Sequence, residues 1–170
     1  MKIMIASDIH GSATYCNDLL EAFEREAADK LLLLGDILYH GPRNPLPDGY
    51  DPQAVAKLLN QYKQQILCVR GNCDSEVDQM MLEFPIMAEY CILSVGKRMV
   101  FATHGHQYNE AHLPMLQARD VLLHGHTHVP MLVDRGEYFY ANPGSVSLPK
   151  ENSPRSYLLL DDENFTLKAL

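Results

Sequence analysis

Short apolar runs alternate with helical segments along the first part of the chain, and this order restricts the fold more than any other feature. Three segments are uninterrupted apolar runs, and two carry apolar side chains at helical spacing, the second of them after a candidate N-cap, Asp51. The strand and helix segments follow one another in the order 2–6, 15–28, 31–34, 52–62 and 66–69. This order predicts a parallel sheet with right-handed crossovers, and therefore an α/β fold.

The second part of the chain is richer in strands than the first. Extended segments are expected at 87–95, 98–103, 121–124, 131–134, 138–141, 156–160 and 165–169. Together with the first part, they predict two mixed sheets packed against each other with helices outside. The length of 170 residues is that of one domain, so we expect residues 1–170 to form a single unit. The stretch 40–50, rich in glycine and proline, predicts a long functional loop.

Charge and cysteine content exclude several classes of protein. The formal net charge is −8, whereas proteins that bind a nucleic-acid backbone are usually basic, so no stable nucleic-acid binding is expected. No apolar run approaches the ~18 residues of a membrane span, and the N-terminal apolar run is cut at Asp8, too early for a signal peptide. The four cysteines show no paired spacing and are read as reduced thiols. We therefore expect a cytoplasmic protein without a membrane partner.

Polar side chains follow five of the predicted strands at the point where each strand ends. The stretches are Asp8-Ile9-His10, Gly35-Asp36, Arg70-Gly71-Asn72-Cys73-Asp74, His104-Gly105-His106 and His124-Gly125-His126-Thr127-His128. The carboxyl ends of parallel strands share one edge of a sheet, so these side chains should converge there. Any one of these stretches alone is ordinary for a turn, but five at equivalent positions predict a common site.

The converging side chains have the chemistry of a transition-metal site. Carboxylate, amide and imidazole groups without thiolate favour manganese, iron or zinc over magnesium or calcium. The candidate ligands are too many for one ion: Asp8, His10, Asp36, Asn72, His104, His126 and His128. Two divalent ions about 3.5–4 Å apart that share one carboxylate would fit this number, and such pairs activate water against phosphate esters.

These residues, in this order, resemble the pattern of the calcineurin-like metallophosphoesterase superfamily. The shared motifs extend from residue 8 to residue 128. The stretches 39–45, 70–77 and 142–145 are similar to those of the small bacterial YfcE-type phosphodiesterases. The resemblance implies a four-layer α/β/β/α sandwich and a hydrolase that cleaves a small phosphodiester substrate.

The resemblance also implies a role for each ligand. Asp8, His10 and His128 would hold one metal ion, manganese above all, with iron or zinc as alternatives. The second ion would be held by Asn72, His104 and His126, with Asp36 as the bridging carboxylate. A hydroxide between the ions would attack phosphorus in line and displace the alcohol.

Further candidates line the same motifs. The superfamily commonly has a histidine at the position of Cys73, so this thiol either restricts the enzyme to diesters and good leaving groups or only fills space. Asp74 is expected to orient a neighbouring ligand or substrate group, and His106 to contact the substrate as a second candidate catalytic group. Arg43, Asn72 and Asn142 are candidates for substrate binding, although Asn142 also suits a structural turn. His124 is either a support for a ligand or a packed strand residue.

Two other functions remain open from the sequence. The same fold serves as a protein-binding scaffold with a decayed metal site in the retromer subunit Vps29, which makes a scaffold with little turnover the main alternative. A nuclease resembling the Mre11 group would need additional DNA-gripping domains, for which this acidic chain has no room. The sequence does not specify the physiological substrate, the native metal or the oligomeric state, and it is compatible with a homo-oligomer.

Overall fold

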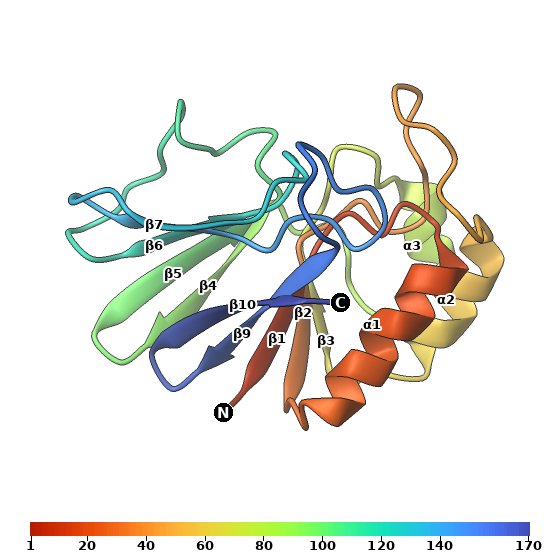
Figure 1. Cartoon of the computed structure of the whole chain (residues 1–170), viewed down its shortest axis with the longest axis horizontal. Coiled ribbons are helices and arrows are strands. Elements are labelled where there is room, and N and C mark those ends of the chain that lie inside the picture. Colours follow the sequence, from red (N-terminus) through yellow and green to blue (C-terminus); the bar gives the residue numbers. More distant parts are fainter.

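The computed structural model describes all 170 residues and consists of two mixed five-stranded sheets with helices on one side (Figure 1). The helices are α1 (Ala13–Arg25), α2 (Pro52–Asn60) and α3 (Glu76–Met81). The strands are β1 (Ile3–Ala6), β2 (Lys30–Leu33), β3 (Ile66–Cys68), β4 (Tyr90–Val95), β5 (Arg98–Thr103), β6 (Val121–His124), β7 (Met131–Asp134), β8 (Phe139–Asn142), β9 (Ser156–Asp161) and β10 (Asn164–Ala169). The α/β class and the two mixed sheets expected from the sequence are confirmed.

The first sheet has the strand order β10-β9-β1-β2-β3. β1, β2 and β3 run parallel, as the strand–helix alternation predicts, with Ile3 opposite Lys30 and Leu31 opposite Ile66. The last two strands join antiparallel, and β9 pairs directly with β1. The C-terminal hairpin therefore extends the sheet that the N-terminal segment begins.

The second sheet has the order β4-β5-β6-β8-β7. Its three central strands are parallel, and the edge strands β4 and β7 are antiparallel to their neighbours. The parallel strands of both sheets carry their carboxyl ends to the same region of the molecule, which is the upper middle of Figure 1, beneath the loops. This arrangement places the predicted site residues together.

The run of four leucines in and after β2 shows how the core is built. Leu31 and Leu33 belong to the cluster under the helices, whereas Leu32 and Leu34 belong to the cluster between the two sheets. Successive side chains of a strand point to opposite faces, so a strand covered on both sides has to be apolar throughout. The predicted buried strand therefore belongs to a sheet that is covered on both faces, by the helices on one side and by the second sheet on the other.

The helix ends follow from their caps. The Ser12 hydroxyl accepts the Tyr15 N–H at the start of α1, and the Asp51 carboxylate accepts the Ala54 N–H at the start of α2, as predicted. The short helix α3 was not predicted. Its signal is Ser75 followed by Asp78, which form a reciprocal capping box.

The outer face of the second sheet is not covered by a helix. Phe101, Leu122 and Tyr140 form a small cluster there, against which Tyr108 and Leu116 of the β5–β6 loop pack. The fourth layer of the sandwich is thus a loop in this chain, because residues 104–120 contain no helix. None of the three helices has the length and apolar character required to cross a membrane.

Candidate metal centre

The seven predicted metal ligands lie together where five strands end. Each follows the carboxyl end of a parallel strand: Asp8 and His10 after β1, Asp36 after β2, Asn72 after β3, His104 after β5, and His126 and His128 after β6. Five strands of two sheets therefore supply one centre. The convergence predicted from the chain order is present in the structure.

One group of ligands surrounds Asp8. The Asp8 Oδ1 atom lies 3.2 Å from His128 Nε2 and 3.5 Å from His10 Nε2. The two Nε2 atoms are 3.3 Å apart, and all three side chains are buried. These atoms can act as ligands of a single cation.

A second group surrounds His104. Its Nε2 atom lies 3.0 Å from Asn72 Oδ1 and 3.1 Å from His126 Nδ1. Asp36 lies between the two groups, with its Oδ2 atom 3.6 Å from His10 Nε2 and 3.5 Å from His104 Nε2. This is the position of a carboxylate that two ions could share.

The ring orientations show why a cation fits here. The Nδ1 atoms of His10, His104 and His128 lie 2.9, 2.7 and 2.6 Å from backbone carbonyl oxygens, which only accept hydrogen bonds. Each Nδ1 therefore carries a hydrogen, and each neutral ring turns the lone pair of Nε2 into the site. The Nε2 lone pairs of His10 and His128 face each other at 3.3 Å, beside the Asp8 Oδ1 atom, which is buried and accepts no hydrogen bond. Such a cluster of acceptors requires a cation between them.

Without a metal ion, protons have to take this place. Burial raises the pKa of Asp8, but the neighbouring imidazoles of His10 and His128, followed by that of His104, outweigh it and hold the pKa well below its usual range. Burial lowers the pKa of His10, but Asp8 and Asp36 outweigh it and raise the pKa. Burial and the neighbouring His104 lower the pKa of His126 to about 4, so this ring is neutral and available as a ligand.

The backbone of the ligands is strained. Asp8, His10, Asp36, His126 and His128 all have φ values between 50° and 65°, in the left-handed region. Residues other than glycine adopt this region at a cost of about 1–3 kcal/mol each, and they do so mainly at functional sites. The surrounding structure therefore holds the ligands in a geometry that local preference disfavours.

Several hydrogen bonds hold these turns in place. The hydroxyls of Ser145 and Ser147 both donate to the Asp8 carbonyl oxygen, at 2.9 and 3.1 Å. The His126 N–H donates to Asp8 Oδ2 at 3.0 Å, which ties the β6 end to the β1 end. Ser147 was missed in the sequence because nothing local distinguishes it from an ordinary loop serine.

Two glycines allow the strand ends to approach each other. A Cβ atom on Gly71 would lie 2.1 Å from Asp36 Oδ1, and one on Gly125 would lie 2.0 Å from Ser7 Oγ. A side chain at position 71 would collide with the candidate ligand Asp36. A side chain at position 125 would collide with Ser7 and would come within 2.8 Å of Asp8 Oδ2. The glycines of the Gly-Asn and Gly-His motifs are therefore required by close packing.

Asp74 supports the site from below. Its Oδ2 atom accepts the N–H groups of Asp36 and Gly71, and its Oδ1 atom accepts that of Ile37. The side chain is buried and does not line the cleft over the ligands. Asp74 thus positions a ligand, as one of its predicted roles requires, and the other, orienting a substrate group, finds no support.

Cys73 lies at the edge of the centre. Its N–H donates to Asp36 Oδ1 at 2.8 Å, and its Sγ atom lies 3.2 Å from Asn72 Nδ2. Burial, followed by the charge of Asp36, raises the pKa of the Cys73 thiol. The thiol is therefore fully protonated at neutral pH and lines the cleft in that form.

Two further histidines lie beside the ligands. The ring of His106 is 5.5 Å from that of His104, and burial lowers the pKa of His106, so this ring is neutral at pH 7. His124 packs against Tyr140 and against Gly105, and its Nδ1 donates to the Gly125 carbonyl. His124 thus supports the turn between two ligand stretches, which is the first of its two predicted roles.

The structure places Asn142 away from the cleft, which does not support its predicted contact with the substrate. The side chain is fully buried; its Nδ2 donates to Gly125 O and Thr127 Oγ1, and its Oδ1 accepts the Gly144 N–H. No polar atom remains to face the cleft. The alternative expectation, a structural turn, describes Asn142 correctly.

The ligands open into a polar cleft of about 750 Å³. Arg43, a predicted substrate-binding residue, lines it from the β2–α2 loop, and the exposed Lys150 lines it from the β8–β9 loop. The complete lining is Asp36, Tyr39, Gly41, Pro42, Arg43, Asn44, Asn72, Cys73, His126, Thr127, His128 and Lys150. Lys150 was missed because it belongs to none of the motifs and comes from a segment far along the chain.

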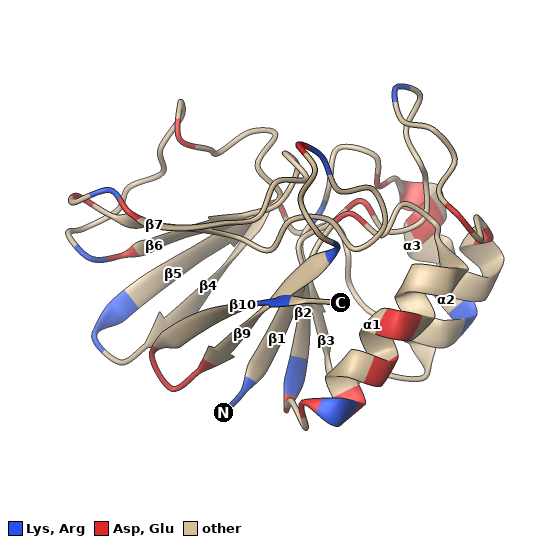
Figure 2. Ribbon diagram, viewed as in Figure 1, with Lys and Arg blue, Asp and Glu red and all other residues tan.

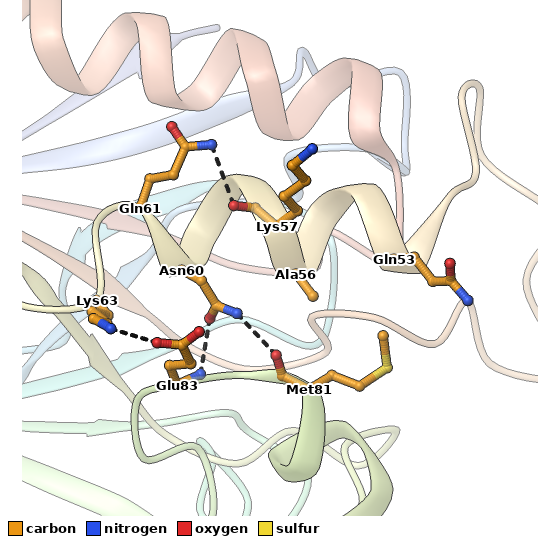
Figure 3. A pocket seen from close by; sticks show the side chains of 8 residues that line it. All are labelled: Gln53, Ala56, Lys57, Asn60, Gln61, Lys63, Met81 and Glu83. Carbon is orange, nitrogen blue, oxygen red and sulfur yellow. Dashed lines mark hydrogen bonds and ion pairs between the residues drawn. The ribbon is translucent and has the colours of Figure 1, made fainter.

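A second hollow of about 490 Å³ lies between α2 and α3 (Figure 3). Several of its polar groups are satisfied locally: Asn60 bonds to the backbone of Met81 and Glu83, and Lys63 pairs with the Glu83 side chain. The hollow contains no histidine or cysteine. The cleft over the metal centre, which is lined by His126, His128 and Cys73, is therefore the better candidate for a functional site.

Comparison with known proteins agrees with the fold and shows the family of the chain. A family model described as a calcineurin-like phosphoesterase superfamily domain matches residues 1–164. The chain is 51% identical over 170 residues to the Escherichia coli K12 protein named phosphodiesterase YfcE, covering all of this chain and 92% of the relative. A solved structure of Yfce, a phosphoesterase from E. coli, superposes with a TM-score of 0.97 at 50% identity, covering 99% of this chain and 93% of that one.

The scaffold alternative has weaker structural relatives. Vps29 of Chaetomium thermophilum superposes with a TM-score of 0.67 at 17% identity, covering 98% of this chain and 86% of that chain. This likeness extends to the fold alone, whereas the E. coli relatives match in sequence over the full chain. On the family model and the 51% identity together, the chain belongs to the calcineurin-like phosphoesterase superfamily.

Proposed function

We propose that the protein is a phosphodiesterase that uses two divalent metal ions, manganese above all, to hydrolyse a small phosphodiester. The observation that carries the proposal is the pair of ligand groups with Asp36 between them, in which His10, His104 and His128 turn their Nε2 lone pairs inward. The similar E. coli protein is named a phosphodiesterase, which supports the same reaction here. When bound, the two ions would supply Lewis-acid activation of water and neutralise charge on the phosphoryl oxygens.

The candidate ligands would bind one ion or the other according to their positions in the two groups. Asp8, His10 and His128 would hold the first ion, and Asn72, His104 and His126 the second. Asp36 would contact both. Because Asn72 is exposed in the cleft, its amide is also placed to contact a phosphoryl oxygen.

The surrounding residues would bind the substrate and limit the choice of leaving group. Arg43 would attract the anionic ester from the rim of the cleft. The neutral ring of His106 beside His104 is proposed to contact the substrate. Cys73 cannot protonate an alkoxide effectively, because its pKa is raised, so the enzyme should prefer esters of acidic alcohols and diesters over monoesters.

The test is hydrolysis of an activated aryl phosphodiester by metal-stripped protein before and after addition of manganese. We expect manganese-dependent turnover that falls at least ~100-fold in Asp36→Asn, because this change removes the carboxylate shared by both groups. Asp18→Asn, on the exposed face of α1, is the matched control and should keep its activity.

The scaffold alternative makes the opposite prediction. A Vps29-like scaffold would show no turnover with manganese, iron or zinc, even with stoichiometric metal bound. That result would overturn the proposed phosphodiesterase. The complete ligand set argues against this outcome, because a centre used only for binding would have no need to hold five strained residues around it.

A further inference from the structure

The cleft over the metal centre is positively charged on an acidic molecule. The net charge of the chain is −8, yet the charged residues that line the cleft, apart from the ligand Asp36, are Arg43 and Lys150. In Figure 2 blue segments lie on the β2–α2 loop and on the β8–β9 loop, both above the ends of the parallel strands. The two cations are thus concentrated where the substrate would enter.

Neither cation is used by the protein itself. Arg43 and Lys150 are exposed, and no ion pair or side-chain hydrogen bond involves the guanidinium or the ammonium group. Several other basic residues of the chain are occupied; Lys63, Arg135 and Lys168, for example, each pair with a glutamate. Free cations in a polar cleft are available for an anionic ligand.

The backbone under Lys150 is firmly attached to the metal centre. Its N–H donates to the His128 carbonyl at 3.1 Å, and the Ser153 hydroxyl donates to the Lys150 carbonyl at 2.6 Å. Two residues earlier, the Leu148 carbonyl accepts the Nδ1 hydrogen of His128. The backbone that carries the Lys150 side chain is therefore held at a defined place relative to the candidate ligands, on the side of His128.

A count of charges shows that the scissile phosphate does not need these cations. The two carboxylates among the seven candidate ligands contribute −2, two divalent ions would contribute +4 and the attacking hydroxide would contribute −1, which leaves +1 at the centre. A phosphodiester carries a single negative charge. Arg43 and Lys150 would therefore be in excess if the substrate had no other charged group.

We propose that Lys150, together with Arg43, selects phosphodiesters whose organic arm carries a second anionic group, such as another phosphate. This inference rests on the proposed phosphodiesterase function and names the class of its substrate. Two cations on two different loops can contact a group several atoms away from the scissile phosphorus, where the metal ligands do not reach. Ammonium and guanidinium groups are the usual partners of phosphate.

The test compares two substrates that differ only in the distant charge. They are thymidine 5′-(p-nitrophenyl phosphate) and the same compound with a 3′-phosphate, both hydrolysed by manganese-loaded protein. We expect the kcat/KM of the phosphorylated compound to be about tenfold higher, mainly through KM, and the preference to weaken at high ionic strength. In Lys150→Gln the ratio should approach one, and in Lys150→Glu it should invert.

The control variant is Lys97→Gln, in the exposed turn between β4 and β5, which has the same charge change and should keep the native ratio. A native ratio near one, or a tenfold ratio that survives in Lys150→Gln, would overturn the inference and leave the proposed function intact. If neither compound is hydrolysed, the proposed function fails. The inference is then decided by calorimetry, since adenosine 3′,5′-bisphosphate should bind about tenfold more tightly than adenosine 5′-monophosphate to native protein but not to Lys150→Gln.

Discussion

The side chain of Cys73 lines the cleft at the edge of the candidate metal centre. Burial and Asp36 raise the pKa of its thiol, which makes the thiol a poor proton donor to an alkoxide. We expect Cys73→His to increase hydrolysis of esters with poor leaving groups by at least ~10-fold, while an aryl diester with a good leaving group changes little. Rates across a series of esters with graded leaving-group pKa values measure this.

The slope of rate against leaving-group pKa should be shallower in the variant than in the native protein. Cys73→Ser, which has the size of the thiol but no better acidity, is the control and should keep the native slope. An unchanged substrate profile in Cys73→His would mean that the native thiol only fills space beside Asn72.

Asp74 acts on the centre through the backbone. Its carboxylate accepts three N–H groups, two of them from Asp36 and Gly71. We expect Asp74→Asn to leave at least one of these buried donors unpaired, to lower the free energy of unfolding by about 1–3 kcal/mol, and to weaken manganese binding about 10–100-fold. Denaturant unfolding and metal titration measure the two effects.

Asp78→Asn separates the two effects, because this residue accepts backbone and hydroxyl hydrogen bonds only within the α3 capping box. It should cost stability and leave manganese affinity unchanged. Equal metal affinity in native protein and Asp74→Asn would contradict the positioning role.

At the scale of elements, the site depends on how closely the ends of β2 and β3 approach. Gly71 lies against Asp36, and an added Cβ would come within 2.1 Å of Oδ1 and 2.3 Å of the backbone nitrogen. The φ of Gly71 is not in the left-handed region, so the cost of a side chain here is steric. Gly71→Ala should therefore destabilise the protein by more than about 2 kcal/mol and abolish manganese-dependent turnover, measured by unfolding and kinetics.

Gly136 provides the opposite case, with a φ of 85° and nothing within 4 Å of an added Cβ. Gly136→Ala should cost only the backbone strain, about 1 kcal/mol, and retain full activity. If both variants behaved alike, close packing of the strand ends would not be what the Gly-Asn motif provides.

At the scale of the whole molecule, the centre joins two sheets and should link stability to pH. The pKa values of His106, His124 and His126 are lowered, that of His126 to about 4, and that of His10 is raised. These three imidazoles therefore bind protons more readily in the unfolded chain, whereas His10 and the buried Asp74, whose pKa values are raised, bind them more readily in the folded protein. Stability of the metal-free protein should therefore fall as the pH drops from 6.5 towards 4, by about 1.4 kcal/mol per pH unit for each net proton.

Manganese should oppose this loss, because it binds the neutral rings of the folded state only. At a hundredfold excess over its dissociation constant, one ion adds about 2.7 kcal/mol of stability, or a rise in Tm of several degrees. Asp36→Asn should show a much smaller rise. Calorimetric scans at pH 7 and pH 5 test both statements, and a Tm independent of pH in the metal-free protein would contradict the first.

The amino-acid sequence by itself determined the class of the fold and the set of candidate ligands. Strand and helix order is a local property, and the ligand motifs each follow a strand, so their convergence could be predicted from the geometry of parallel sheets. Even β5, β6 and β7 have the bounds that the apolar pattern predicts. The helix α3 could not be predicted, because its six residues include no buried side chain and therefore show no apolar periodicity.

Only the tertiary structure decided what depends on contacts between distant segments. Whether Asn142 faces the substrate or the protein depends on Gly125 and Thr127, which come from another strand end. Lys150 belongs to no motif, and it reaches the cleft because a turn of a distant loop is bonded to His128. The strained turns at the ligands are likewise maintained by partners far along the chain, since no local preference favours them.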